Sequence, residues 1–267
     1  MNTSSPDLPV LKHCFPFRLA VPSYILPDAI IPNVRLLGAH FDEIALVLFE
    51  SVYPDNLPSH DQVRTLASLA ADLDVTYHVH LPIDVYLARA EEAQRRKDVA
   101  TIFRFYEGTA GLDPTCYVMH LEPAPRDADT HPGAWLDQAE QSLQELVDLG
   151  MNPAHIAVEN TLYPLGSMAP MVLSKGFTLC QDLGHLILQH HDINDHLAAH
   201  MPHTRMIHLH GIDQDRDHKH LGNLPLPLWQ TITTGLADYT RGLCLEVFSL
   251  QDLLLSCPRI QELCREP

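Results

Sequence analysis

Positive charge is scarce in this chain. Its 267 residues include 17 Lys and Arg against 34 Asp and Glu, so the formal net charge is −17 at pH 7. A protein that follows a phosphate backbone needs clustered cations. The charge balance therefore argues against a nucleic-acid partner and favours a small-molecule substrate.

Long apolar runs are also absent. No stretch approaches the roughly 20 apolar residues of a membrane-spanning helix, and residues 1–11 lack the basic and apolar regions of a signal peptide. These absences predict a cytoplasmic protein with no membrane contact.

The chain has no CxxC pair, and its six cysteines fall below the density of a secreted disulfide scaffold. We expect reduced thiols. Cys180 and Cys244 each lie two residues before an acidic residue of an expected strand, and side chains alternate along a strand. These two residues and Cys116 are therefore expected to fill space inside the fold rather than to bind metal.

Composition and length fit one globular unit. Hydrophobic residues make up 46% of the chain and charged residues 19%, which is ordinary for a protein with a large core. Residues 1–16 contain Pro6, Pro9 and Pro16 with little periodicity, so we expect an N-terminal arm. Residues 17–267 are expected to form a single domain.

Within that domain, apolar runs alternate with segments of helical period. The expected strands are 18–24, 41–49, 75–80, 116–121, 156–160, the run before Asp182, 206–210 and 243–247. The expected helices are one from Asp28, then 61–73, 88–111, 132–149, 167–174, 192–200, 227–236 and one that opens at Ser249. Residues 91–98 are expected to form a solvated face, and 213–222 a polar loop. This alternation predicts the α/β class and a (βα)8 TIM barrel.

Metal-competent side chains end most of these apolar runs. They are His80, His120, Glu159, Asp182, His210 and Glu246, with His185 and the region of His218 just beyond. The carboxyl ends of barrel strands share one mouth. Burying so many acids and imidazoles together costs several kcal/mol per group unless cations compensate. The pattern therefore predicts a cluster of divalent ions.

Two reaction classes fit such a cluster. Several ions would lower the pKa of a bound water to about 7 and hold a phosphoryl oxygen, as in phosphoester hydrolysis. A single ion beside an acid would instead polarise the hydroxyl and carbonyl groups of a sugar for isomerisation. The spacing of the residues does not choose between them.

Four segments resemble the xylose-isomerase-like barrels, which include endonuclease IV and many sugar-phosphate isomerases and epimerases. The segments are Val158-Glu159-Asn160-Thr161, Asp182-Leu183-Gly184-His185, His210-Gly211-Ile212-Asp213 and Leu245-Glu246. The resemblance implies a first ion at His80, His120 and Glu159 and a second at Glu159, Asp182, His210 and Glu246.

A third ion would follow from the same resemblance. It would use His185 and His218, with Asp215 or Asp217 as a substitute because Arg216 stands where the family has Asp. The chain would then hold two or three divalent ions. Zinc is the metal expected first, and manganese, iron and cobalt are the alternatives.

Further segments resemble the cobamide-remodelling phosphodiesterases (CbiR). They are Phe15-Pro16-Phe17-Arg18, Pro22-Ser23-Tyr24-Ile25, Pro32-Asn33-Val34-Arg35, residues 43–50 and residues 217–222. This resemblance implies a metal-dependent phosphodiesterase that splits the nucleotide loop of cobalamin or pseudocobalamin into cobinamide phosphate and an α-ribazole-type nucleoside. Glu159, Asp182 and Glu246 would be catalytic, and Arg18 and Tyr24 would contact the corrinoid substrate.

Two alternatives remain at this point. A sugar-phosphate isomerase or epimerase would need one principal ion at Glu159, Asp182, His210 and Glu246. A corrinoid or metal carrier would use surface histidines as loose ligands, although these lack one fixed spacing and we expect most of them to be solvated. They are His190, His191, His196, His200 and His203.

Overall fold

A computed structural model describes residues 8–127, 132–161, 163 and 165–264. Residues 1–7 of the expected N-terminal arm lie outside the described residues. From Leu8 on, the arm packs against the barrel. Leu8 and Leu11 are buried, and the Leu11 amide donates to the His40 carbonyl at 2.8 Å.

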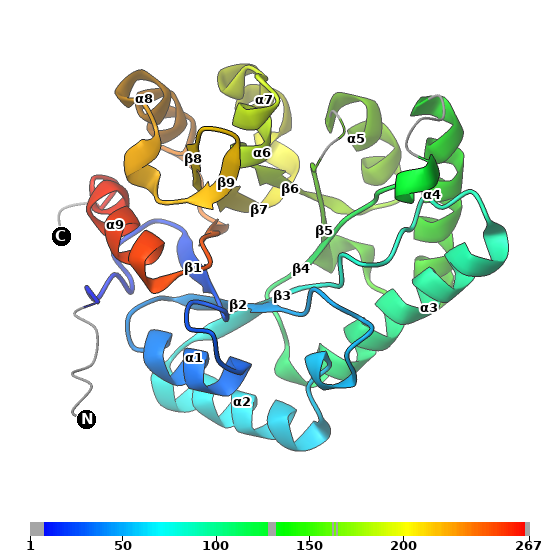
Figure 1. Ribbon diagram of the computed structural model, residues 1–267, viewed down its shortest axis with the longest axis horizontal. Helices are drawn as coiled ribbons and strands as arrows, with labels where there is room; N and C mark the ends of the chain where they lie inside the picture. The colour runs from blue at the N-terminus through cyan, green and yellow to red at the C-terminus, as the bar shows by residue number, and fades with distance from the viewer. Residues whose placement is uncertain (1–7, 128–131, 162, 164, 265–267) are drawn as a thin grey trace.

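In the described part of the chain, eight parallel strands close into a barrel in the order β1-β10-β7-β6-β5-β4-β3-β2 (Figure 1). The strands are β1 Arg18–Pro22, β2 Glu43–Val47, β3 Thr76–His80, β4 Tyr117–Met119, β5 Ile156–Glu159, β6 Thr178–Asp182, β7 Thr204–Leu209 and β10 Gly242–Leu245. The predicted (βα)8 barrel is confirmed.

Helices form the outer ring of the barrel (Figure 1). They are α1 Ile30–Leu37, α2 His60–Leu73, α3 Glu92–Thr109, α4 Pro132–Asp148, α5 Leu165–Ser174, α6 Leu183–Leu188, α7 Ile193–His200, α8 Leu226–Gly235 and α9 Leu250–Gln261. The short helix α6, which follows β6 directly, was not expected. Its N-cap is Asp182, whose side chain accepts from the His185 amide.

The middle of the barrel is filled by small side chains. Alternate strand residues point inward, and on most strands the inward residue at mid-height is small or sulfur-containing. This inner cluster comprises Ala20, Ala45, Cys116, Val118, Ala157, Cys180, Met206 and Cys244. All three cysteines lie in this inner cluster, as expected, but the ligand atom of Cys180 also lies within 4.8 Å of those of Glu159 and His208. Strand register places His78 beside Ala45 and His208 beside Cys244, so these two histidines border the apolar layer.

At the amino end of the strands, Glu43 is the centre of a buried ion-pair network. Its carboxylate lies 3.1 Å from Nδ1 of His78 and 3.4 Å from Nε of Arg18, and it accepts from the Thr115 hydroxyl. Burial by itself raises the pKa of Glu43, but His78 and Arg18 outweigh it and lower the pKa to about 2. Arg18 therefore belongs to the barrel floor.

Replacing Glu43 with Gln is expected to destabilise the fold by about 3 kcal/mol, because it leaves His78 and Arg18 without their charged partner. Chemical denaturation of the variant measures this loss. The exposed Glu50→Gln exchange is the matched control and should change stability by less than about 0.5 kcal/mol.

The same network makes the stability of the fold depend on pH. Glu43 has a folded pKa of about 2, below its ordinary value of 4.5. Ionised Glu43 thus stabilises the fold fully above pH 4.5, and this stabilisation is lost as the pH falls towards 2. The stability difference between wild type and Glu43→Gln should shrink across that window, and a constant difference would contradict the assignment.

Two segments differ from the sequence expectation. In the run 91–98, Arg95 and Asp98 are buried rather than solvated: Asp98 accepts from Nε of Arg89 at 2.9 Å, and Arg95 donates to Gln141 of α4 at 2.8 Å. The expected loop 213–222 contains an antiparallel hairpin of β8 Gly211–Asp213 and β9 Arg216–Lys219. The hairpin carries His218 back to the barrel mouth.

Among the described residues, no helix has the length and apolar character needed to cross a membrane.

Candidate metal centre

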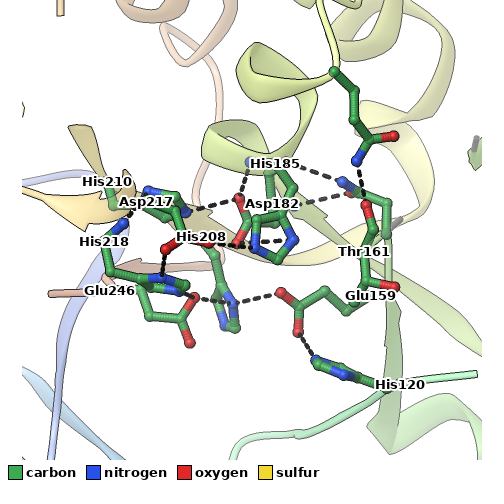
Figure 2. A network of polar contacts seen from close by, with 12 residues as sticks. His120, Glu159, Thr161, Asp182, His185, His208, His210, Asp217, His218 and Glu246 are labelled. Atoms are coloured by element: carbon green, nitrogen blue, oxygen red, sulfur yellow. Dashed lines mark hydrogen bonds and ion pairs between the residues drawn. The ribbon is translucent and has the colours of Figure 1, made fainter. Parts of the chain in front are cut away.

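Four buried side chains meet at the carboxyl end of the barrel (Figure 2). Glu159 and Asp182 are the last residues of β5 and β6, His208 lies on β7, and Glu246 follows β10. Strand register sets Asp182 and Cys244 beside His208. Potential ligand atoms of the four residues all lie within 4.8 Å of one another. We call these residues the central group.

His208 is the member of this group that the sequence did not single out. Its Nδ1 lies 3.1 Å from Oε1 of Glu159 and 3.0 Å from Oε2 of Glu246. The expectation assigned this place to His210, two residues further along. Both side chains point inward because alternation has a period of two, but the register of β6 with β7 makes His208 level with Asp182.

His208 and the two glutamates of the central group shift one another's pKa values. Burial alone lowers the pKa of His208, but Cys180, Glu246 and Glu159 together raise it well above its usual value. Burial alone raises the pKa values of Glu159 and Glu246, but His208 and its neighbours hold both well below the usual range. Both carboxylates are therefore ionised at neutral pH. A metal ion at this place would displace the proton of His208.

A second group shares Glu159 with the first. Nε2 of His80 and Nε2 of His120 each lie 3.2 Å from Oε2 of Glu159. Nδ1 of His80 is 3.0 Å from the Leu81 carbonyl. When Nδ1 of His80 carries the proton and donates it to this carbonyl, Nε2 keeps a lone pair that faces the site. These three residues form the group to which the resemblance assigned a first ion.

A third group lies on the other side of the central group, formed by Asp182, His185, His210 and His218. Nε2 of His210 is 3.2 Å from Oδ1 of Asp182. Of the two candidate aspartates, Asp215 is exposed, whereas Asp217 lies 3.1 Å from His218 and 3.7 Å from His185. Asp217 therefore contacts both histidines from outside the group.

Backbone contacts hold Asp182 and His210 in place. The Asn160 side chain bonds both the amide and the carbonyl of Asp182, at 2.9 and 3.0 Å. Gly184 lies so close to His210 that a Cβ at this position would overlap the imidazole ring.

Replacing Gly184 with Ala is therefore expected to displace His210, to lower the metal content of the purified protein and to cost about 1–3 kcal/mol of stability. Elemental analysis and denaturation measure the two effects. Gly166→Ala is the matched control, since a Cβ there meets nothing within 4 Å. Equal metal content in both variants would contradict the role of His210.

The groups open into a cavity of about 290 Å³ with an apolar wall. Phe49 and Phe248 form that wall, with ring centroids 5.7 Å apart, and pack against His80 and His218 respectively. The described residues that line the cavity are Phe49, His80, Ile83, His120, Glu159, His185, His218, Glu246 and Phe248, without a Lys or Arg. The sequence did not single out the two phenylalanines as site residues, since an apolar residue after a strand gives no signal.

Neither expected substrate contact lines this cavity. Arg18 lies at the opposite end of the barrel beside Glu43. Tyr24 is half exposed and lines a separate cavity with Ser23 and Asp28.

The residues fit divalent metal ions. Buried polar atoms normally have hydrogen-bond partners, but three atoms of these groups have none among the described residues. They are Oδ2 of Asp182, Nδ1 of His185 and Nε2 of His208. Carboxylates and imidazoles converging with free lone pairs are the donor set that divalent metals use.

No family model and no curated protein matches the sequence, but solved structures do. A D-tagatose 3-epimerase-like protein aligns with a TM-score of 0.76 and 19% identity over 92% of this chain and 97% of its own. D-psicose 3-epimerase of Clostridium cellulolyticum H10 aligns with a TM-score of 0.72 and 11% identity, over 92% of this chain and 98% of its own. A xylose isomerase domain protein of Alicyclobacillus acidocaldarius aligns with a TM-score of 0.66 and 15% identity, over 93% of this chain and 98% of its own. The chain thus has the fold of the xylose-isomerase-like barrels.

These similarities contradict the predicted cobamide phosphodiesterase. The similar structures include several sugar epimerases, so they favour the alternative of a sugar isomerase or epimerase. The prediction of phosphoester hydrolysis, cobamide remodelling and a corrinoid substrate was wrong. It relied on N-terminal segments that include Arg18 and Tyr24, and neither of these residues lines the cavity at the metal groups.

Proposed function

We propose that this protein is a metal-dependent enzyme that epimerises or isomerises a sugar at a carbon next to a carbonyl group. One observation carries the proposal: Glu159 and Glu246, from different strands, both contact Nδ1 of His208 within a group that also contains Asp182. This arrangement supplies two ionised carboxylates within a single set of metal ligands.

The central group would hold the principal ion. Three carboxylates and one imidazole form an oxygen-rich ligand set that suits Mn²⁺. When bound, the ion supplies Lewis acidity that polarises a carbonyl and the hydroxyl beside it. Asn160 orients Asp182 for this task through its two backbone hydrogen bonds.

Glu159 and Glu246 would carry the protons. Inversion at carbon requires that a proton leave from one face and return to the other, so two acid–base groups are needed. Each carboxylate is held ionised by neighbouring histidines, Glu159 by His208 and His120, and Glu246 by His208 and His218. One ionised carboxylate would accept the proton from carbon at its Oε atom. The other, after taking a proton from solvent, would return that proton to the opposite face of the carbon.

The flanking groups would hold further ions. His80, His120 and Glu159 on one side, and Asp182, His185, His210 and His218 on the other, are rich in imidazole, which suits Zn²⁺. Asp217 would fix the orientation of His185 and His218 from outside. Two or three ions per chain would result.

The cavity favours an unphosphorylated sugar. A phosphate group is normally bound by Arg, Lys or a helix N-terminus, and the described lining contains neither cation. Phe49 and Phe248 instead offer apolar surface to the C–H face of a sugar ring, while the acids and histidines face its hydroxyl groups.

A substrate panel tests the proposal. Purified protein loaded with Mn²⁺ or Zn²⁺ is incubated with free ketopentoses, ketohexoses and 3-keto sugars, and with their phosphates, and the products are separated by chromatography. We expect conversion of a free sugar and little conversion of its phosphate. No conversion of any sugar under either metal would overturn the proposed function.

A further inference from the structure

Three surface histidines outside the barrel mouth lie together. His196 and His200 are on α7, four residues apart, so they project from the same side of the helix. Their ring centroids are 5.9 Å apart. His191, in the segment between α6 and α7, has its ring 5.1 Å from that of His196. We call these residues the α7 histidines.

Packing fixes the helix that carries them. Ile193 and Leu197 of α7 are buried, and Leu197 packs directly on Gly235 of α8, where an added Cβ would lie 2.4 Å from Cδ1 of Leu197. Asp192 caps the helix and accepts from the Asp195 amide at 3.1 Å. Since the apolar side of α7 is held against α8 (Figure 1), His196 and His200 keep their mutual position at the surface.

One ring nitrogen of the α7 histidines is unpaired among the described residues. All three are only partly exposed, and Nδ1 of His196 is buried without a hydrogen-bond partner among the described residues. Such a nitrogen can bind a metal ion without giving up a hydrogen bond.

We propose that the α7 histidines form a second metal site, separate from the barrel mouth, for a divalent transition metal that prefers imidazole. Zn²⁺, Ni²⁺ and Cu²⁺ have this preference. The ligand atoms of the three rings do not all lie within 4.8 Å of one another, so their side chains would rotate to bind the ion, with His196 and His200 chelating it from one helix face and His191 completing the set. Water would occupy the remaining positions, as the partial exposure of the cluster allows.

The α7 site differs from the groups at the barrel mouth in its ligands, and it takes no part in the proposed catalysis. It contains imidazole alone, whereas each group at the mouth includes a carboxylate. It does not depend on the proposed sugar chemistry, because none of its residues lines the catalytic cavity. Failure of the sugar assay would leave it unaffected.

Equilibrium dialysis against Zn²⁺ tests the site. The probe proteins are the untagged wild type, the double variant His196→Gln/His200→Gln and the control double variant His60→Gln/His155→Gln, which removes two exposed histidines elsewhere. We expect the α7 variant to bind one Zn²⁺ fewer per chain than the wild type, and the control to match the wild type. Equal binding by all three proteins would overturn the proposal.

A measurement on the wild type covers the case in which the α7 variant does not fold. Diethyl pyrocarbonate modifies accessible histidines, and mass spectrometry reports the extent at each residue. Zn²⁺ should protect His196 and His200 at least tenfold while His155 reacts as before. Unchanged modification of His196 and His200 in the presence of Zn²⁺ would refute the site.

Discussion

Replacing Glu246 with Gln is expected to lower kcat/KM for sugar epimerisation by about 10³-fold, the usual size of an acid–base contribution. The amide keeps the shape of the side chain, but it cannot accept a proton and it removes one negative charge beside His208. Steady-state kinetics with the best sugar of the panel measure the loss. Circular dichroism and thermal unfolding should confirm that the variant is folded.

Glu122→Gln is the matched control for Glu246→Gln. Glu122 lies 3.9 Å from Nδ1 of His120, so it is an acid near the site that belongs to none of the three groups. Its replacement should change kcat/KM by less than about threefold, whereas Asp182→Ala, which removes a ligand of the principal ion, should abolish turnover. Activity of Glu246→Gln within tenfold of the wild type would exclude Glu246 as an acid–base group.

Removing the metal is expected to have the second large effect. A ligand present at about 1,000 times its Kd stabilises the folded state by about 4 kcal/mol. In a domain of this size each kcal/mol shifts the unfolding temperature by about 2–4 °C. Chelation should therefore lower the unfolding temperature by about 10 °C, and added Mn²⁺ or Zn²⁺ should restore it.

His208→Gln tests where that stabilisation arises. Since His208 is the one imidazole of the central group, the variant should lose most of the shift on chelation. The surface variant His196→Gln/His200→Gln should keep it. A full shift in His208→Gln would mean that the central group does not hold the principal ion.

The barrel and most of its mouth could be predicted from sequence. Runs such as 156–160 and 206–210 end in metal-competent side chains, and parallel strands bring such ends together whatever the sequence between them. Glu159, Asp182 and Glu246 followed from this rule alone. The structure brings them within reach of one another, as the rule requires.

The exact ligands could not be predicted in the same way. His208 and His210 both face inward, and the choice between them depends on how β7 pairs with β6 and β10. That register is set by the closed sheet, not by the segment itself. The burial of Arg95 and Asp98 likewise depends on packing: Arg95 donates to Gln141 of α4, and Asp98 accepts from Arg89 before α3.

The reaction class was the least predictable feature. Carboxylates and imidazoles at a barrel mouth serve hydrolysis and isomerisation equally, so the ligands did not distinguish them. The prediction of hydrolysis relied on segments such as 15–18 and 22–25. In the first of them, Arg18 pairs with Glu43 and does not reach the mouth. The cavity wall of Phe49 and Phe248 bears directly on the substrate, but it is formed by segments far apart in the sequence.

Solvent hydrogen exchange tests the central claim most directly. The metal-loaded protein is incubated in D₂O with a free ketose that the panel identifies, and proton NMR follows the C–H signal next to the carbonyl. The account predicts loss of that signal together with appearance of the epimer, in the wild type but not in Glu246→Gln or after chelation. Epimer formation with full retention of the C–H proton, or exchange that persists without metal, would contradict it.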